Sequence, residues 1–509
     1  MLKIQLNSIT NTKENQLFEV NNYKHFEFDE NSPVILLNEL AKELVFNNKS
    51  KVKNHNKGRK SKNSIDVMFK IILLSAYYSE LELRKIIRNC NENINFIYLL
   101  NGEEAPKLTR LQKFIVKYRE DIIDLLYQFT NILKRKNIIN ENEVFIDGTK
   151  IEAFSNKYTF VWRGTVMYYQ KKNHIKIERI LLDYLTLKGK DLNLSQIVPN
   201  EEVEMLVKEY TKIKELSELN EKQKILKDLG LELEKVLDKE RKYLEQLKIL
   251  GDRNSYSKTD IYATFMRSKK DYMKNGQLIP AYNVQIAVNS NYILDFKIFQ
   301  NPTDYKTLPV FIEHLKSNGY DFKNVVADAG YESYENLKYL SDNGYTSYIK
   351  PQKHEVNKKR KNKNDIKNII NLTYNEETEE FLRKDGVVYK VSREYKYKGL
   401  IRTVFTAQDE EGHSFSISLK DYKLKKINRD NILSELGAKY RLNRSIQVER
   451  PFGDIKENFE FDRFRRKGID KVELEFAMYA LGFNLRKYIN DKRKNRENID
   501  LYKLKEVVA

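Results

Sequence analysis

Cysteine is nearly absent from this sequence: Cys90 is the only one among 509 residues. A single thiol excludes disulfide bonds within the chain and zinc sites built from several cysteines, and it is typical of a reducing compartment. Long apolar runs are missing too, because the most apolar early stretch, residues 67–78, is short and contains Lys70. Residues 1–20 lack the apolar core of a signal peptide. We therefore expect a soluble intracellular protein that does not contact a membrane.

Acidic residues are outnumbered by basic ones. The chain has 92 Lys and Arg against 73 Asp and Glu, a formal net charge of +19. Such an excess favours a polyanionic partner, and nucleic acid is the first candidate. A basic but otherwise ordinary soluble protein is the alternative. The length exceeds what a single core organises, which predicts two or three domains.

Helical patterns occupy two parts of the chain. Residues 1–140 are predicted to be mainly helical, with a basic loop at residues 58–64. Short helices after a basic approach are typical of a helix-turn-helix DNA-binding region, and generic helix packing is the alternative. Apolar residues between 226 and 250 follow alternating steps of three and four, broken only by Glu240, as in a coiled coil. This pattern predicts a helical hairpin inserted at about residues 175–255.

Strand patterns surround that hairpin. Residues 281–300 alternate polar and apolar on both sides of a turn, "NSN", which predicts a β-hairpin. Another apolar strand is predicted to end at Asp328, and about 352–430 is predicted to be a strand-rich insertion. We therefore expect an α/β domain with a mixed sheet at residues 141–490, followed by a basic C-terminal tail at 491–509.

Two aspartates are predicted at strand ends. Asp147 in "EVFIDGT" is expected to close one strand, and Asp328 in "VVADAGY" to close another. An α/β sheet places its ligands outside the carboxyl ends of its strands. A turn is the alternative for Asp147, because Asp and Gly are both common turn formers.

A helical glutamate completes this set. The apolar stripe predicted for residues 444–461 consists of Val448, Phe452, Ile455 and Phe459. Glu449 and Lys456, seven residues apart, lie nearly above one another on an adjacent face. Pro451 removes a backbone donor, so the helix is expected to begin near residue 450 or to kink there.

Three converging carboxylates would repel one another unless cations neutralise them. Hard oxygen ligands combined with substrate phosphates suit Mg²⁺ or Mn²⁺. Two such ions can activate an attacking oxygen and stabilise the leaving one in phosphodiester chemistry. A basic protein with this site is predicted to cut or join DNA strands.

Five motifs in order resemble one family: "FIDGTKIEA", "NKYTFVW", "YNVQIAV", "VVADAGY" and "VERPFGDIK". They resemble the DDE transposases of bacterial insertion sequences, in the insertion-sequence-four-like superfamily and its insertion-sequence-1182 type. The resemblance runs from about residue 55 to 490. It implies a ribonuclease-H-like mixed-sheet catalytic domain with a helical N-terminal DNA-binding region and an inserted helical hairpin. It also implies a cytoplasmic, nucleoid-associated bacterial protein.

The resemblance assigns roles to individual residues. The catalytic and metal-binding residues it implies are Asp147, Asp328 and Glu449, with two Mg²⁺ or Mn²⁺ ions. Lys456 matches the lysine of the family's Tyr-Arg-Glu-Lys signature. Arg444 lies five residues before Glu449, where the signature has its arginine four before, and that position is Ser445 here. Lys456, Arg444 and Arg450 are the expected DNA contacts.

The implied activity is transposition. Such a protein binds the terminal inverted repeats of its element, hydrolyses a strand at each end and joins the 3′-hydroxyl to target DNA, as a homodimer in the synaptic complex. The alternatives are a metal-dependent nuclease without strand transfer and a non-catalytic DNA-binding protein derived from a transposase.

Three further residues have two interpretations each. Tyr158 and Trp162 follow the first strand, and they either stack on an unpaired base or pack in the core. Asp304 matches a position that is often acidic in relatives, but helix capping is an adequate explanation for it.

Overall fold

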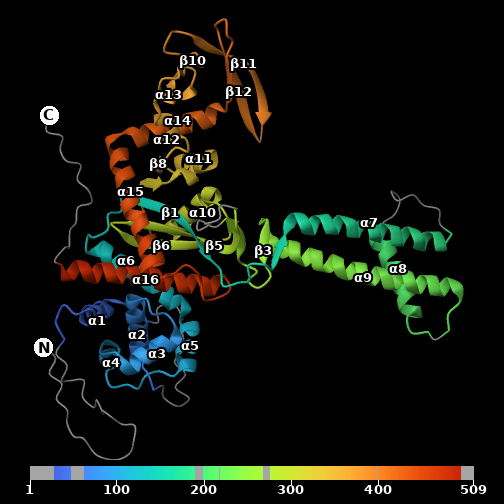
Figure 1. Ribbon diagram of the computed structural model, residues 1–509, viewed down its shortest axis with the longest axis horizontal. Helices are drawn as coiled ribbons and strands as arrows, with labels where there is room; N and C mark the ends of the chain where they lie inside the picture. The colour runs from blue at the N-terminus through green and yellow to red at the C-terminus, as the bar shows by residue number, and fades with distance from the viewer. Residues whose placement is uncertain are drawn as a thin grey trace, which may run out of the picture.

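The structure, a computed structural model, describes residues 28–46, 62–189, 199–216, 218–267, 276–397 and 399–494. A central body contains the main sheet (Figure 1). The N-terminal helices lie at one end of it, a strand-rich lobe lies at the other, and a long helical arm projects sideways. Most of the basic loop expected at 58–64 and most of the expected tail at 491–509 lie outside the described residues.

The body is built on a six-stranded mixed sheet in the order β4-β5-β1-β7-β8, with β6 paired to β5. Its strands are β1 (Glu143–Glu152), β4 (Thr264–Arg267), β5 (Leu278–Asn289), β6 (Tyr292–Phe299), β7 (Asn324–Ala327) and β8 (Thr346–Ile349). β1, β7 and β8 run parallel, whereas β5 is antiparallel to β1, β4 and β6. The expected mixed α/β architecture is therefore confirmed. Helices α10 (Leu308–Ser317) and α11 (Tyr334–Asp342) connect the strands from β6 to β8.

The β-hairpin expected at residues 281–300 is present as β5 and β6. Its two turn residues, Ser290 and Asn291, have φ values of 52° and 62°. Positive φ at both central positions is the geometry of a type I′ turn, whose twist matches that of the flanking strands. Every residue of β5 from Pro280 to Asn289 is buried, because both faces of this part of the sheet are covered.

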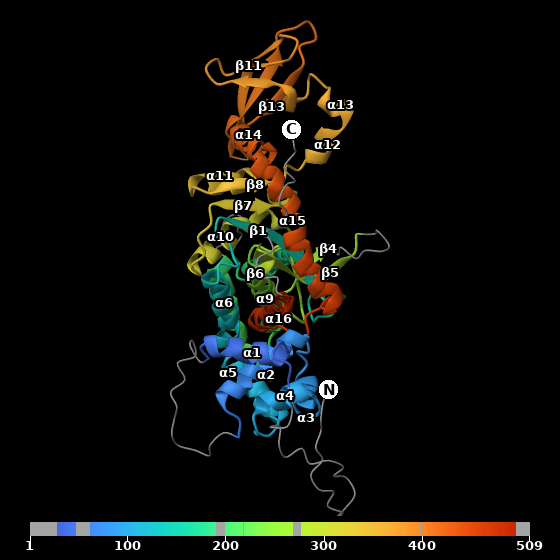
Figure 2. The same ribbon diagram turned by 90° about the vertical axis from the view of Figure 1, so that its left-hand side faces the viewer.

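Helix α16 (Ile469–Arg493) joins the sheet to the N-terminal helices. It is apolar around most of its circumference, which is typical of a helix buried on all sides. α16 lies between the sheet and the N-terminal helices (Figure 2). Asn484 accepts a hydrogen bond from the backbone N–H of Ile293 at 2.9 Å and donates one to its carbonyl at 2.8 Å. The N-terminal helices are α1 (Pro33–Glu43), α2 (Ile65–Tyr78), α3 (Leu83–Glu92), α4 (Ile94–Leu100), α5 (Leu108–Lys117) and α6 (Arg119–Arg135).

The arm is a helical hairpin with a third helix packed against it. It consists of α7 (Arg163–Leu187), α8 (Pro199–Ile213) and α9 (Glu221–Leu250). The predicted apolar seam is buried at Leu226, Leu233 and Val236. Glu240, the polar break in the seam, accepts hydrogen bonds from Gln170 and Asn173 of α7. The hairpin is therefore present, but α7 begins at Arg163, before the expected start of the insertion.

The strand-rich lobe is a separate five-stranded antiparallel sheet in the order β13-β12-β11-β10-β9. Its strands are β9 (Thr373–Asn375), β10 (Glu380–Leu382), β11 (Val388–Tyr397), β12 (Leu400–Ala407) and β13 (Ser414–Ile417), and the short helices α12 (His354–Lys358) and α13 (Arg360–Lys363) precede it. Its own small core contains Phe381, Tyr389 and Phe405. The strands of this lobe lie between residues 373 and 417.

Two helices return the chain from this lobe to the body: α14 (Leu419–Leu433) and α15 (Glu435–Gly453). The helix containing Glu449 neither begins near residue 450 nor breaks there, because α15 continues through Pro451 to Gly453. A π-helical turn, η6 (Asp454–Asn458), follows it directly. Within the described ranges, no helix is both long enough and apolar enough to cross a lipid bilayer.

Candidate active site

Asp147 and Asp328 lie at matching positions of neighbouring parallel strands. β1 and β7 pair in register as far as Ile146 opposite Ala327, so the next residue on each strand is an aspartate. The expectation that Asp147 closes its strand is wrong, because β5 keeps pairing with β1 as far as Glu152. What ends at this point is the parallel pairing with β7. The two carboxylates therefore meet at the place where the sheet opens.

Arg444 on α15 lies between these two aspartates. One guanidinium nitrogen, Nη2, is 3.2 Å from Oδ2 of Asp147 and 3.8 Å from Oδ2 of Asp328. The arginine and Asp147 side chains are mostly buried, whereas that of Asp328 is 39% exposed. The Nε atom of Arg444 is buried without a hydrogen-bond partner among the described residues. One cation of the chain itself thus offsets part of the negative charge of the aspartate pair.

A third carboxylate, Asp304, lies beside the pair. Its Oδ1 accepts hydrogen bonds from Asn283 at 2.8 Å and from Gln285 at 2.7 Å. A Cβ atom on Gly148 would lie 2.7 Å from that oxygen. Asp304 therefore lies close to the backbone of Gly148, the residue that follows Asp147. The capping interpretation of Asp304 is wrong, because its side chain is engaged by β5 instead. Sequence reasoning missed this arrangement, since it depends on two amides that face the site only after the hairpin has paired with β1.

Tyr331 lies close enough to these acids for their charges to affect its pKa. It follows Asp328 in the short 3₁₀ turn η4 (Ala329–Tyr331), is fully buried and donates its O–H to Gln285. Burial raises the pKa of Tyr331 well above its usual range; the charges of Asp304, Asp147 and Asp328 raise it further, and that of Arg444 opposes them. The phenol therefore stays protonated and supports Gln285, which in turn holds Asp304.

Glu449 does not join the aspartate pair. Its side chain is exposed, and the described residues contain no group of three or more acidic, histidine or cysteine side chains placed to hold a metal ion. The physical reason lies in the helix. Glu449 follows Arg444 by five residues, which places it about 140° further around the helix axis. While Arg444 is directed at the aspartates, Glu449 faces elsewhere, so the expected triad is not assembled.

The two remaining cations expected to contact DNA differ in their surroundings. Lys456, on η6, donates a hydrogen bond to the side chain of Thr149, two residues beyond Asp147 on β1. Arg450 is on the exposed side of α15, with its Nε atom 3.9 Å from Asp454. Lys456 therefore lies at the margin of the candidate active site, whereas the Arg450 side chain is 54% exposed.

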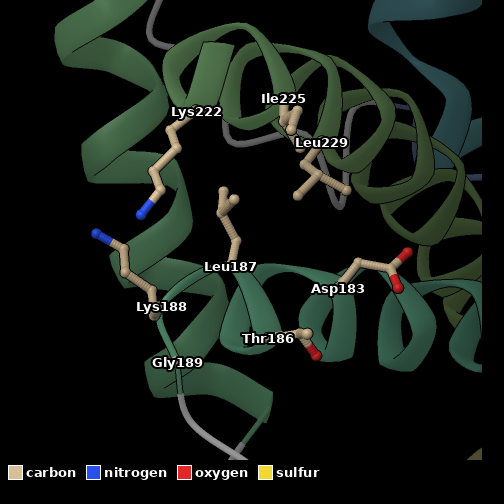
Figure 3. A pocket seen from close by; sticks show the side chains of 8 residues that line it. All are labelled: Asp183, Thr186, Leu187, Lys188, Gly189, Lys222, Ile225 and Leu229. Atoms are coloured by element: carbon tan, nitrogen blue, oxygen red, sulfur yellow. The ribbon is translucent and has the colours of Figure 1, made fainter. Parts of the chain in front are cut away.

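A hollow of about 760 Å³ lies far from the carboxylates, near the tip of the arm. Leu187, Ile225 and Leu229 contribute apolar side chains to it, with Lys188 and Lys222 on one side (Figure 3). Among the described residues that line the hollow, Asp183 is the only acidic one. These residues therefore provide no converging catalytic groups.

Two known families match parts of this chain. Residues 253–485 match the family described as "Transposase DDE domain", and residues 22–117 match the one described as "Transposase domain (DUF772)". Neither the curated proteins nor the solved structures contain a match. The two matches support a DDE transposase of insertion sequences, a class of protein that binds DNA and whose catalytic domains generally use divalent metal ions.

The matched DDE segment contains Asp328 and Glu449 but not Asp147. The arm, with α7 and α9 between residues 163 and 250, separates Asp147 from the start of the match at residue 253. The pairing of β1 with β5 and β7 restores the connection in space. Asp147 therefore belongs to the same sheet as the matched segment, although a long insertion stands between them in the sequence.

Proposed function

We propose that this protein is a transposase that binds the terminal inverted repeats of its insertion sequence, cleaves a strand at each end and transfers the 3′ ends to target DNA. The observation that carries the proposal is the adjacent placement of Asp147 and Asp328 on parallel strands. The transposase matches and the net charge of +19 support it. We further propose the insertion-sequence-1182 type, a ribonuclease-H-like catalytic sheet, and action on the nucleoid in the bacterial cytoplasm.

The residues at the aspartate pair fit a divalent cation. Asp147 and Asp328 already share a cation, the Arg444 guanidinium, so the place between them suits a positive charge. Their carboxylate oxygens are the hard ligands that Mg²⁺ and Mn²⁺ prefer. Glu449 would complete the set after a change in the helix that carries it, which removes Arg444 from the pair. Two bound ions would supply activation of the attacking oxygen and stabilisation of the leaving oxygen.

The chain's own cations would hold the DNA. Once released from the aspartates, Arg444 can bind a phosphate through two parallel hydrogen bonds, whereas Lys456 acts as a point charge. Arg450 would contact the backbone further from the cut. We assign recognition of the terminal repeats to residues 1–140, and assembly of a homodimer in the synaptic complex to the arm.

A plasmid-nicking assay with and without Mg²⁺ tests the catalytic assignment. Asp147→Asn, Asp328→Asn and Glu449→Gln should each abolish nicking while DNA binding persists. Asp342→Asn is a matched control, because Asp342 is an exposed acid paired with Lys338 away from the site. Mg²⁺-dependent nicking that survives in one of the three variants removes that residue from the proposed triad.

Two further assays separate the alternatives. A nuclease without strand transfer would nick the plasmid but leave a mixture of pre-cleaved terminal repeats and target DNA unjoined. A non-catalytic DNA-binding protein would bind the repeats and show neither activity. The adjacency of Asp147 and Asp328 favours an enzyme, because a protein that only binds DNA gains nothing from two acids beside the phosphates.

A further inference from the structure

Residues 153–172, "AFSNKYTFVWRGTVMYYQKK", have an unusual composition. They contain six aromatic residues and four cations but no acidic residue. Across the whole chain only 12% of residues are aromatic. The segment follows β1 directly and includes β2 (Phe160–Trp162), which pairs with β3 (Ser255–Ser257) where the arm leaves the body, and the first turns of α7. Such a density of rings either builds a core or serves a partner.

Burial decides against a core. Five of these rings are exposed to solvent by about half or more, and we call them the aromatic strip: Phe154 (47%), Tyr158 (86%), Phe160 (47%), Tyr168 (56%) and Tyr169 (50%). Leaving such side chains in solvent forgoes the stabilisation that their burial would give. Exposed aromatic surface concentrated in one short segment is typical of an interaction site. Tyr158 therefore does not pack in the core, which was one of its two interpretations.

Positive charges accompany the rings. The guanidinium of Arg463 and the ammonium of Lys467 each lie 5.4 Å from the ring centre of Phe154. The ammonium of Lys172 lies 4.6 Å from that of Tyr168. The nearby acid Glu152 is neutralised by ion pairs with Lys157 at 3.2 Å and with Arg463 at 3.4 Å. The strip is therefore an aromatic surface with a positive charge, which suits a polyanion that carries flat rings.

We propose that the aromatic strip binds unpaired nucleotides of a DNA strand, with bases stacked on the rings and phosphates held by the neighbouring cations. Stacking on aromatic side chains requires no particular base and needs bases free of their complement. Phe154 is seven residues from Asp147 along the chain, hence within about 25 Å of it. A strand leaving the aspartate pair can therefore reach the strip. This inference rests on the proposed function in one respect: cleavage at the aspartate pair would supply the unpaired strand.

The experiment measures binding of a labelled oligothymidylate to the full-length protein by fluorescence anisotropy, with a duplex of the same length in parallel. Replacing both Tyr158 and Tyr168 by Ala should weaken oligothymidylate binding about tenfold or more, since each stacked base contributes ~1–3 kcal/mol. The same double change to Phe keeps the rings and should stay within about twofold of wild type. Tyr397→Ala is the matched control, because Tyr397 is similarly exposed but lies in the strand-rich lobe.

Trp162 provides an internal probe. It is the only tryptophan of the chain, and its ring centre lies 6.1 Å from that of Phe160, within the segment that carries the strip. Oligothymidylate should quench its fluorescence in the wild type and in the Phe variant, and quench it far less in the Ala variant. This readout depends on the strip itself and not on cleavage.

Three outcomes would overturn the inference. Unchanged oligothymidylate affinity in the Ala variant would exclude stacking on the strip, and so would an equal loss in Tyr397→Ala. A change in sedimentation coefficient without a change in oligothymidylate affinity would assign the strip to a contact between copies of the chain. The proposed function fails separately: a protein that stacks oligothymidylate on the strip but never nicks DNA with Mg²⁺ binds DNA without being a transposase.

Discussion

Replacing Arg444 by Ala tests whether this side chain takes the place of a metal ion in the DNA-free protein. The change removes the cation between Asp147 and Asp328 and leaves two carboxylates facing each other. Without metal the variant should therefore be less stable than the wild type. With Mn²⁺ or Mg²⁺ the lost charge is replaced, so the difference in stability should shrink or change sign.

The distances give the size of the effect. At 3.2 Å and 3.8 Å, and with an effective dielectric constant of about 20, the two attractions are each ~4–5 kcal/mol before desolvation is counted. Desolvation and the partial exposure of Asp328 reduce the net contribution to roughly 1–3 kcal/mol. Each kcal/mol lowers the thermal midpoint by about 2–4 °C in a domain of 150–250 residues and by less in a longer one. We expect a drop of a few degrees in EDTA.

Metal affinity should move in the opposite direction. In the wild type, a bound ion must displace the guanidinium of Arg444, and that cost disappears in the variant. An affinity gain of about tenfold corresponds to ~1.4 kcal/mol, within the range above. Calorimetric titration with Mn²⁺ and thermal unfolding with and without EDTA measure both effects independently of any activity.

Arg450→Ala is the matched control on the same helix. Arg450 is exposed, and its contact with Asp454 is long, at 3.9 Å. Its removal should therefore cost less than ~1 kcal/mol and leave the affinity for Mn²⁺ unchanged. If Arg444→Ala binds Mn²⁺ no more tightly than Arg450→Ala and is equally stable in EDTA, Arg444 does not compete with the metal, and the reasoning from these distances is refuted.

Three further predictions concern the rest of the fold. Burial raises the pKa of Cys90 to about 12, so a thiol reagent should modify it only after unfolding, as followed by absorbance. Burial also raises the pKa of Glu475 above its ordinary 4.5. The contribution of Glu475 to stability is therefore present below pH 4.5 and lost as the pH rises through the raised pKa. Glu475→Gln should weaken this pH dependence of the free energy of unfolding, as measured by denaturant titration. Gly482→Ala would place a Cβ 2.1 Å from the carbonyl oxygen of Ala76 and should destabilise by about 1–3 kcal/mol or more, whereas Gly164→Ala in open space should stabilise by about 0.5–1 kcal/mol in the same assay.

Much of the architecture could be predicted from local patterns. Alternation over residues 281–300 identifies a hairpin because side chains on a strand point alternately to opposite faces. The steps of three and four in the arm identify its seam for the corresponding reason in helices. The strand preceding Asp328 and the buried stripe that includes Val448 were predicted in the same way, and the structure contains both. These features depend only on neighbours within a few residues of each other.

The arrangement of the site could not be read from the same patterns. That Asp147 lies beside Asp328 depends on the register between β1 and β7, which no local pattern encodes. The place of Arg444 between them, and the direction of Glu449 away from them, depend on how α15 is rotated over the sheet. Local patterns allow a cap for Asp304, whereas its amide partners, Asn283 and Gln285, face it only when β5 has paired with β1.

The sequence by itself therefore determined the net charge and the positions of the helical and strand segments. It also determined that Asp147, Asp328 and Glu449 lie on or next to those segments. The tertiary structure alone decided which acids meet, which cation neutralises them and which rings of the segment after β1 stay in solvent. The physical reason is the range of the forces involved. Periodicity and turn chemistry act between residues close in the chain, whereas register, helix rotation and solvent exposure are settled only when distant segments pack together.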